Sequence, residues 1–206
     1  MKKKFITFII MLLLICSGQV GLASEEYPIP DNFGSLMDKA YDAVYRKLEI
    51  SDTLLYDFYI FDENCLGLST ISRAIGTQLS LSQMRDYHHK SLERYQPDNN
   101  FILMVMAYDL ENSTNVKEID TQIAFRNSEG QFMKGSIIED ESYDQLALIS
   151  FPKKDFEQFI GNDDLITIQF TDRDNNKHNI FYNRYYVDEI PQQIRELIDL
   201  VEEDIK

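Results

Sequence analysis

The sequence predicts an α+β fold: an antiparallel β-sandwich or a curled sheet of about seven strands, with amphipathic helices near the N-terminus, in the middle and at the C-terminus. Apolar residues recur at helical spacing in residues 33–50, 79–95 and 190–205. Residues 101–183 instead contain short runs of β-branched and aromatic residues, separated by turn sequences. We expect one domain over residues 24–206, with a possible sub-boundary near residue 97, a β-rich part at 98–187 and the C-terminal helix at 190–205.

The first 23 residues have the layout of a secretory signal peptide. Three lysines, at positions 2–4, precede an apolar run at residues 5–15, and Gly21 and Ala23 supply small residues before a cleavage point. The run is shorter than the roughly 20 residues that a membrane-spanning helix needs. The protein is therefore expected outside the cytoplasm, periplasmic or secreted, and the lysine-led leader favours a bacterial origin.

Cys16 offers an alternative fate for the leader. It follows the apolar run directly, where a bacterial lipoprotein places its lipid-modified cysteine, and Leu13 fits the start of such a motif. Ile15, however, stands where a small residue is normally required. Lipidation at Cys16 would turn a released protein into a membrane-anchored one.

The chain is strongly acidic, with 35 Asp and Glu against 20 Lys and Arg and a formal net charge of −15. Cleavage after Ala23 would remove three lysines and make the charge more negative still. Repulsion then opposes binding to nucleic acid or anionic lipid. Cationic partners and divalent cations remain compatible with this charge. Cys65 would be the single cysteine left, so the fold cannot depend on an internal disulfide.

The N-terminal part is expected to alternate helices and strands. Residues 33–50 predict a helix, residues 53–61 a strand and residues 66–79 a second, irregular strand. A further helix over residues 79–95 would begin after Ser80 or Ser82 and stop before Pro97.

The rest of the chain is expected to be mainly β-structure. Strands are predicted at residues 101–110, in a hairpin over 119–139, at 145–151, and in a second hairpin at 164–183. A short helix over 152–161 would close at Gly161. The last helix, over 190–205, would carry Pro191 in its first turn.

Two adjacent histidines lie on the predicted middle helix. Successive helical residues point about 100° apart, so His88 and His89 cannot both face one metal ion. His89 and Glu93 are four residues apart and could share an ion, with His178 as a third ligand from elsewhere. This would be the centre of the alternative function, a metal-assisted hydrolase on residues 88–93.

Other candidate sites match their chemistries poorly. Cys65 follows two acidic residues, which oppose formation of a thiolate nucleophile. Asp172, Asp174 and Asn176 alternate as in a calcium-binding loop, but Lys177 stands where that loop needs glycine. No phosphate-binding loop or dinucleotide motif occurs, and no cofactor is predicted.

A cluster of tyrosines near the end of the predicted sheet is the candidate partner-binding surface. Tyr182, Tyr185 and Tyr186 surround Arg184, and Tyr and Arg are residue types that interfaces favour. The leader sequence and the poor match of the candidate catalytic motifs together favour an exported, non-catalytic module that binds a protein or another envelope component. No integral membrane segment is expected after the leader is removed.

Overall fold

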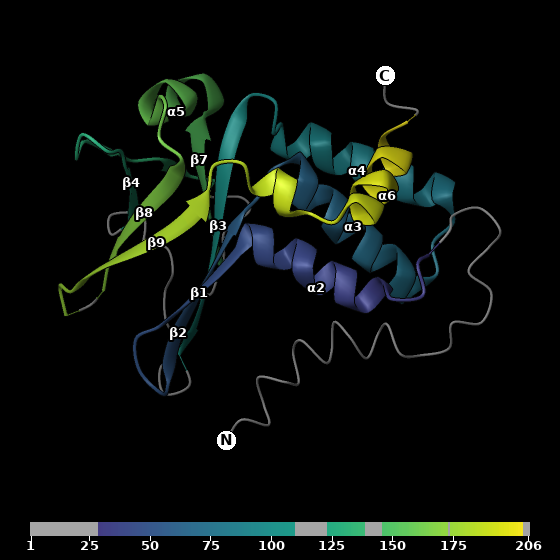
Figure 1. The fold of residues 1–206 in the computed structure, drawn as a ribbon, viewed down its shortest axis with the longest axis horizontal. Coiled ribbons are helices and arrows are strands. Elements are labelled where there is room, and N and C mark those ends of the chain that lie inside the picture. The colour runs from purple at the N-terminus through teal and green to yellow at the C-terminus, as the bar shows by residue number, and fades with distance from the viewer. Residues whose placement is uncertain (1–28, 110–122, 139–145, 173, 204–206) are drawn as a thin grey trace.

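The computed structural model describes residues 29–109, 123–138, 146–172 and 174–203. Within these ranges the fold is mixed α+β, with five α-helices and two antiparallel sheets of five and four strands. Figure 1 shows the sheets on one side of the molecule and most of the helices on the other. The leader and Cys16 lie outside the described residues.

The five-stranded sheet has the order β1-β2-β3-β7-β6, and the four-stranded sheet has the order β5-β4-β8-β9. The strands of the first sheet are β1 (Tyr45–Glu49), β2 (Leu54–Ile60), β3 (Asn100–Asp109), β7 (Leu146–Pro152) and β6 (Ser136–Ile137). The strands of the second are β5 (Phe132–Met133), β4 (Ile123–Arg126), β8 (Leu165–Thr171) and β9 (Lys177–Asn183).

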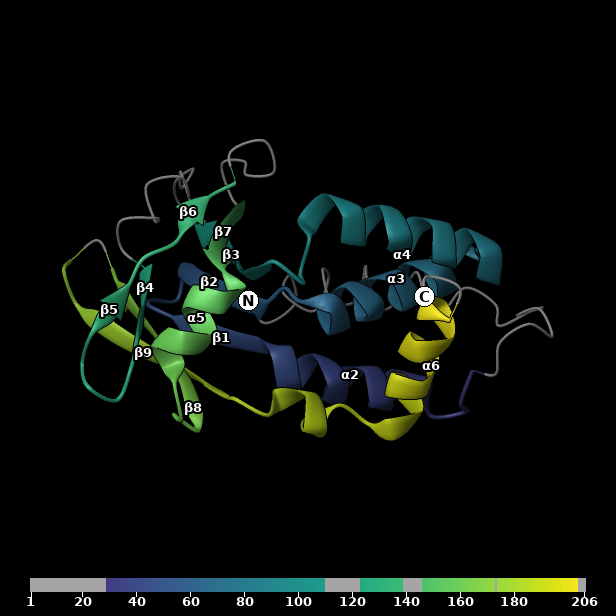
Figure 2. The same ribbon diagram turned by 90° about the horizontal axis from the view of Figure 1, so that it is seen from above.

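Four helices lie together beside the sheets, as Figure 2 shows from above. They are α2 (Phe33–Val44), α3 (Glu63–Thr77), α4 (Leu81–Tyr95) and α6 (Gln192–Glu202). The short 3-10 helix η4 (Tyr186–Glu189) leads from β9 to α6, and α5 (Lys153–Ile160) lies near the sheets. No helix in the described ranges is both long and apolar enough to cross a membrane.

Side chains from both sheets meet in a shared aromatic core. Tyr56 of β2 contacts Phe170 of β8, with ring centroids 4.7 Å apart. Tyr182 of β9 is buried and donates a hydrogen bond of 2.8 Å to the carbonyl of Phe58. Removing such aromatic area from water is a major source of stability.

The predicted helix over 33–50 is too long at its C-terminal end. It stops at Val44, and the chain continues as β1, whose Tyr45 lies opposite Tyr59 in an antiparallel hairpin with β2. The backbone N–H groups of Ile50 and Ser51 both bond to the Leu54 carbonyl and close this hairpin. Pairing with β2 therefore overrides the helical spacing of the apolar residues.

The predicted strand over 66–79 is wrong, because these residues form most of α3. The Asp62 side chain caps the helix by accepting a bond from the Cys65 N–H at 2.9 Å. Gly67 permits close helix packing: a Cβ built there would lie 2.8 Å from Cγ2 of Ile198 in α6. Glycine here serves a tertiary contact, whereas the sequence pattern had suggested an irregular strand.

The return strand of the predicted 119–139 hairpin is divided between the two sheets. β5 pairs with β4, while β6 pairs with β7 in the other sheet. Gly135 lies at this crossing, where a Cβ would be only 2.6 Å from the Ser150 carbonyl oxygen. A bulkier residue would have to push this connection away from β7.

Several other predictions are confirmed. The strand at 53–61, the strand at 101–110 and the β8–β9 hairpin are present. Ser80, not Ser82, caps α4 and forms a reciprocal capping box with Gln83. Gly161 closes α5 with a φ of +58°, and α6 begins directly after Pro191.

Candidate interaction surface

One row of side chains crosses all four strands of the second sheet on its outward side. Phe132 of β5 lies opposite Arg126 of β4, Arg126 opposite Thr167 of β8, and Thr167 opposite Phe181 of β9. Residues directly opposite one another in antiparallel strands project to the same side. Phe132 and Phe181 are 54% and 49% exposed. Two phenylalanines thus flank an arginine and a threonine on an open face.

Alternation along β8 explains why this side faces outward. Ile166, Ile168 and Phe170 are buried in the core, so the intervening residues project away from it. Leu165 is one of these outward residues and is 50% exposed. We call Phe132, Arg126, Leu165, Thr167 and Phe181 the outer apolar face.

This face holds three of the four exposed large hydrophobic side chains in the described part of the chain. Single exposed apolar residues are common on protein surfaces, but grouped ones are typical of binding surfaces. The arrangement depends on strand register, which local sequence patterns do not reveal.

A surface hollow of about 710 Å³ adjoins the outer apolar face. Its lining includes the carboxylates Glu129, Asp155 and Asp163 and contains no lysine or arginine. Gln131, also in the lining, directly precedes Phe132. Hydrogen bonds from Ser128 lower the pKa of Asp163, which keeps this carboxylate ionised. The hollow therefore places three carboxylates beside the apolar face, with the Arg184 guanidinium bonded to the Gly161 carbonyl at the same hollow.

Two of the four predicted partner-binding residues lie inside the protein. Tyr182 is fully buried, and the Arg46 guanidinium lies 4.7 Å from the centroid of its ring. Tyr186 is 7% exposed and donates a hydrogen bond to the Asp62 carboxylate. Their hydroxyl groups serve the fold, and a partner would not reach them.

The other two predicted residues lie at the surface. Arg184 is partly exposed and donates to the carbonyl of Gly161, while Tyr185 is 57% exposed. Tyr185 follows the end of β9, two residues beyond Asn183, which lies opposite Leu165. A binding role for Arg184 and Tyr185 stays a prediction.

The three predicted metal ligands are not brought together. His89 lies on the exposed side of α4, with its Nε2 atom 3.1 Å from Oε1 of Glu93. His178 belongs to β9 and pairs with Asp172 at 2.8 Å. Among all described residues, no three His, Cys, Asp or Glu side chains form a group that could hold a metal ion.

Asp172 organises the turn that resembled a calcium loop. Its carboxylate accepts bonds from the backbone N–H groups of Asp174 and Asn176, from the Asn176 side chain and from His178. The His178 bond and these amide bonds lower the pKa of Asp172 to about 2. The protein's own donors thus occupy the oxygens that a calcium ion would need.

Cys65 lies buried in the first turn of α3. Burial, and then the charge of Asp62, raise the pKa of its thiol. The thiol stays protonated at neutral pH and is a poor nucleophile.

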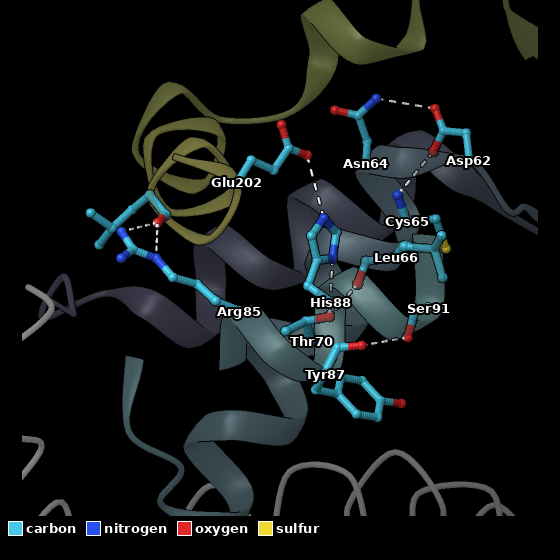
Figure 3. A network of polar contacts seen from close by, with 11 residues as sticks. Asp62, Asn64, Cys65, Leu66, Thr70, Arg85, Tyr87, His88, Ser91 and Glu202 are labelled. Carbon is cyan, nitrogen blue, oxygen red and sulfur yellow. Dashed lines mark hydrogen bonds and ion pairs between the residues drawn. The ribbon is translucent and has the colours of Figure 1, made fainter. Parts of the chain in front are cut away.

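His88 is fully buried between α3, α4 and α6, as Figure 3 shows. Its Nδ1 atom lies 3.3 Å from the Thr70 hydroxyl oxygen, and its Nε2 atom lies 3.5 Å from Oε1 of Glu202. Met84 and His88, four residues apart, are the buried residues of α4. The contacts with Thr70 and Glu202 come from distant helices, so the sequence pattern could not predict them.

Comparisons with known proteins identify no family. No protein-family model matches the chain, and no curated protein matches it either. A crystal structure of a novel protein of unknown function from Burkholderia pseudomallei K96243 is similar, with a TM-score of 0.48 and 10% sequence identity. The likeness covers 81% of this chain and 88% of that one. It assigns no activity to this chain.

Proposed function

We propose that this chain is an exported, non-catalytic binding protein that holds a protein partner, such as another envelope component, on its outer apolar face. The observation that carries the proposal is the row from Phe132 to Phe181, with Leu165 beside it. Aromatic side chains and arginine are the residues that most often dominate binding energy at protein interfaces. Export is supported by the leader sequence of the first 23 residues.

The two sheets would pack as a sandwich. Contacts such as that of Tyr56 with Phe170 support this arrangement. The inner faces would then supply the core, and the outer apolar face would be left for a partner.

Charge indicates what kind of partner this would be. Glu129, Asp155 and Asp163 line the neighbouring hollow, and the chain as a whole carries a formal charge of −15. A second copy of the chain or an acidic protein would be repelled. The best complement is a protein surface with an apolar centre and lysines or arginines around it.

A photo-crosslinking experiment tests the proposal. The residue benzoylphenylalanine is placed singly at position 132, 181 or, as a control, 90, where exposed Lys90 lies on α4. The variants are produced in the protein's own cells and irradiated. We expect one adduct of the same mass from positions 132 and 181 and none from position 90. Equal adducts at all three positions, or none at all, would contradict the proposal.

A second set of variants tests whether the apolar contact matters. Phe132→Ser with Phe181→Ser should remove the adduct formed by a crosslinker at position 165, because the aromatic contact is lost. Both side chains are about half exposed, so the thermal midpoint should change little. An adduct that persists in this double variant would show that the face is not the binding surface.

A further inference from the structure

His88 is a fully buried ionisable side chain that the proposed function does not use. Each of its ring nitrogens faces an oxygen atom from a different helix (Figure 3). Nδ1 lies 3.3 Å from the Thr70 hydroxyl oxygen of α3, and Nε2 forms an ion pair of 3.5 Å with Oε1 of Glu202, the last residue of α6. Whether these contacts attract depends on the protons that the ring carries.

Both oxygens need a proton from the ring. The Thr70 hydroxyl donates its single proton to the carbonyl of Leu66 at 2.9 Å, so toward Nδ1 the same oxygen accepts. The ionised carboxylate of Glu202 can only accept. An imidazolium carries one proton on each nitrogen and supplies both oxygens at once.

A neutral ring would leave one of the two contacts repulsive. It has a single N–H group, and if Nδ1 keeps that proton for Thr70, the lone pair of Nε2 faces the carboxylate of Glu202. Among the described residues Nε2 makes no hydrogen bond that could compensate, so the carboxylate at ion-pair distance decides its state. Burial alone disfavours a charged imidazole, but an opposite charge this close and two acceptors favour it.

The charges on α3 and α6 also favour a cation at this place. Glu202 lies at the C-terminal end of α6, where the helix dipole is negative. Glu63 of α3 lies near Glu202: burial and the charge of Asp62 raise the pKa of Glu63, and the charge of Glu202 adds to this effect, while Lys153 opposes it. A protonated His88 is therefore next to a region rich in carboxylates.

Arg85 of α4 holds the same end of α6. Its guanidinium donates bonds of 3.2 and 3.0 Å to the Leu200 carbonyl and lies 3.6 Å from Oε2 of Glu203. Arginine keeps its charge at every pH at which proteins fold, whereas histidine is the residue type that commonly loses its proton between pH 5 and 8. Of these two basic side chains, only His88 can therefore respond to pH.

We propose that the ion pair of His88 and Glu202 is a pH-sensitive contact that holds the last turn of α6 on α4. While the imidazole is protonated, it donates to Thr70 and to Glu202 and joins three helices. As the pH rises and the proton leaves, the contact with Glu202 becomes repulsive, and this turn loosens toward solvent, where Glu202 is already 27% exposed. The stabilising contribution is therefore present at low pH and is lost as the pH rises. The contact is separate from the outer apolar face, so the two proposals can fail independently.

A pH titration followed by nitrogen NMR of the histidine rings tests the ion pair. We expect both nitrogens of His88 to carry a proton at low pH. Glu202→Gln keeps the size of the side chain and removes its charge, so His88 should lose its proton about one pH unit lower in this variant. The matched control is Glu203→Gln, at the neighbouring position, whose side chain is 68% exposed. A neutral His88 throughout pH 5–8, an unchanged titration in Glu202→Gln, or equal shifts in both variants would overturn the proposal.

Hydrogen exchange tests the effect on α6. Exchange rates are measured on both sides of the His88 titration and corrected for the intrinsic effect of pH on amide exchange. The amides in the last turn of α6 should lose about tenfold in protection once His88 is neutral, while those of α5 keep theirs. Glu202→Gln should abolish this difference between the two pH values. Equal protection of the last turn on both sides of the titration in the unmodified protein would show that the proton does not control α6, and would overturn the proposal.

Discussion

The guanidinium of Arg46 in β1 donates a 2.8 Å hydrogen bond to the carbonyl of Phe181 in β9. The bond joins the edge strand of one sheet to the edge strand of the other. The same guanidinium lies over the ring of Tyr182 and also bonds to the carbonyls of Asp42 and Tyr45. One side chain thus connects the end of α2, β1 and β9.

We expect Arg46→Ala to lower the free energy of unfolding by about 1–2 kcal/mol, because a set of hydrogen bonds and a cation–π contact are lost. Urea denaturation measures this change. Arg46→Lys should recover only part of the loss, since lysine lacks the planar fork that reaches several carbonyls at once. Full recovery by lysine would show that charge alone matters.

Gly67→Ala should destabilise the protein by about 1–3 kcal/mol, because the added methyl group would meet Ile198 at 2.8 Å. The matched control is Gly34→Ala in α2, where a Cβ meets nothing within 4 Å. Alanine favours helix over glycine by up to about 1 kcal/mol, so this control should be neutral or stabilising. Chemical denaturation of both variants compares them directly. Equal effects in the two helices would contradict the packing role of Gly67.

Acid should weaken the β8–β9 hairpin through Asp172. Its pKa is lowered to about 2 in the folded protein, against an ordinary value near 3.9. Its stabilising contribution is therefore present above about pH 4 and is lost as the pH falls toward 2. In Asp172→Asn, the urea concentration at the midpoint of unfolding should therefore decrease less between about pH 4 and pH 2 than in the unmodified protein. Asp174→Asn, at an exposed neighbouring position, should leave the fall unchanged.

Cys65 should resist thiol reagents in the folded protein. It is buried, and its raised pKa keeps it protonated. In the protein without its first 23 residues, a colorimetric thiol reagent should react slowly in buffer and rapidly in urea. Fast labelling of the folded protein would show that the first turn of α3 opens readily.

Capping residues in the sequence correctly predicted where two helices begin or end. Ser80 with Gln83 marks the start of α4, and Gly161 marks the end of α5. Residues 45–49 fit a helix by spacing alone, and only pairing with β2 makes them a strand. Residues 66–79 fit an irregular strand by local pattern, whereas the close neighbour of Gly67 in the helix, Ile198, is far away in the sequence.

The candidate surfaces were harder to predict than the elements. Tyrosine is a residue type that is common at interfaces. Tyr182 and Tyr186 nevertheless lie in the interior, where their hydroxyl groups donate hydrogen bonds to Phe58 and Asp62. Phe132 and Phe181 lie far apart in the sequence and share a face only through strand register. A single sequence does not specify which strands are neighbours, so this surface could not be predicted.

The crossing at Gly135 has a consequence for how the protein tolerates changes in length. The chain leaves β5 in one sheet at Met133 and enters β6 in the other at Ser136, so a very short connection fixes the distance between the sheets. Extra residues inserted there would release that constraint and loosen the shared core. The same insertion in the turn at 127–131, between two strands of one sheet, would extend only a surface loop.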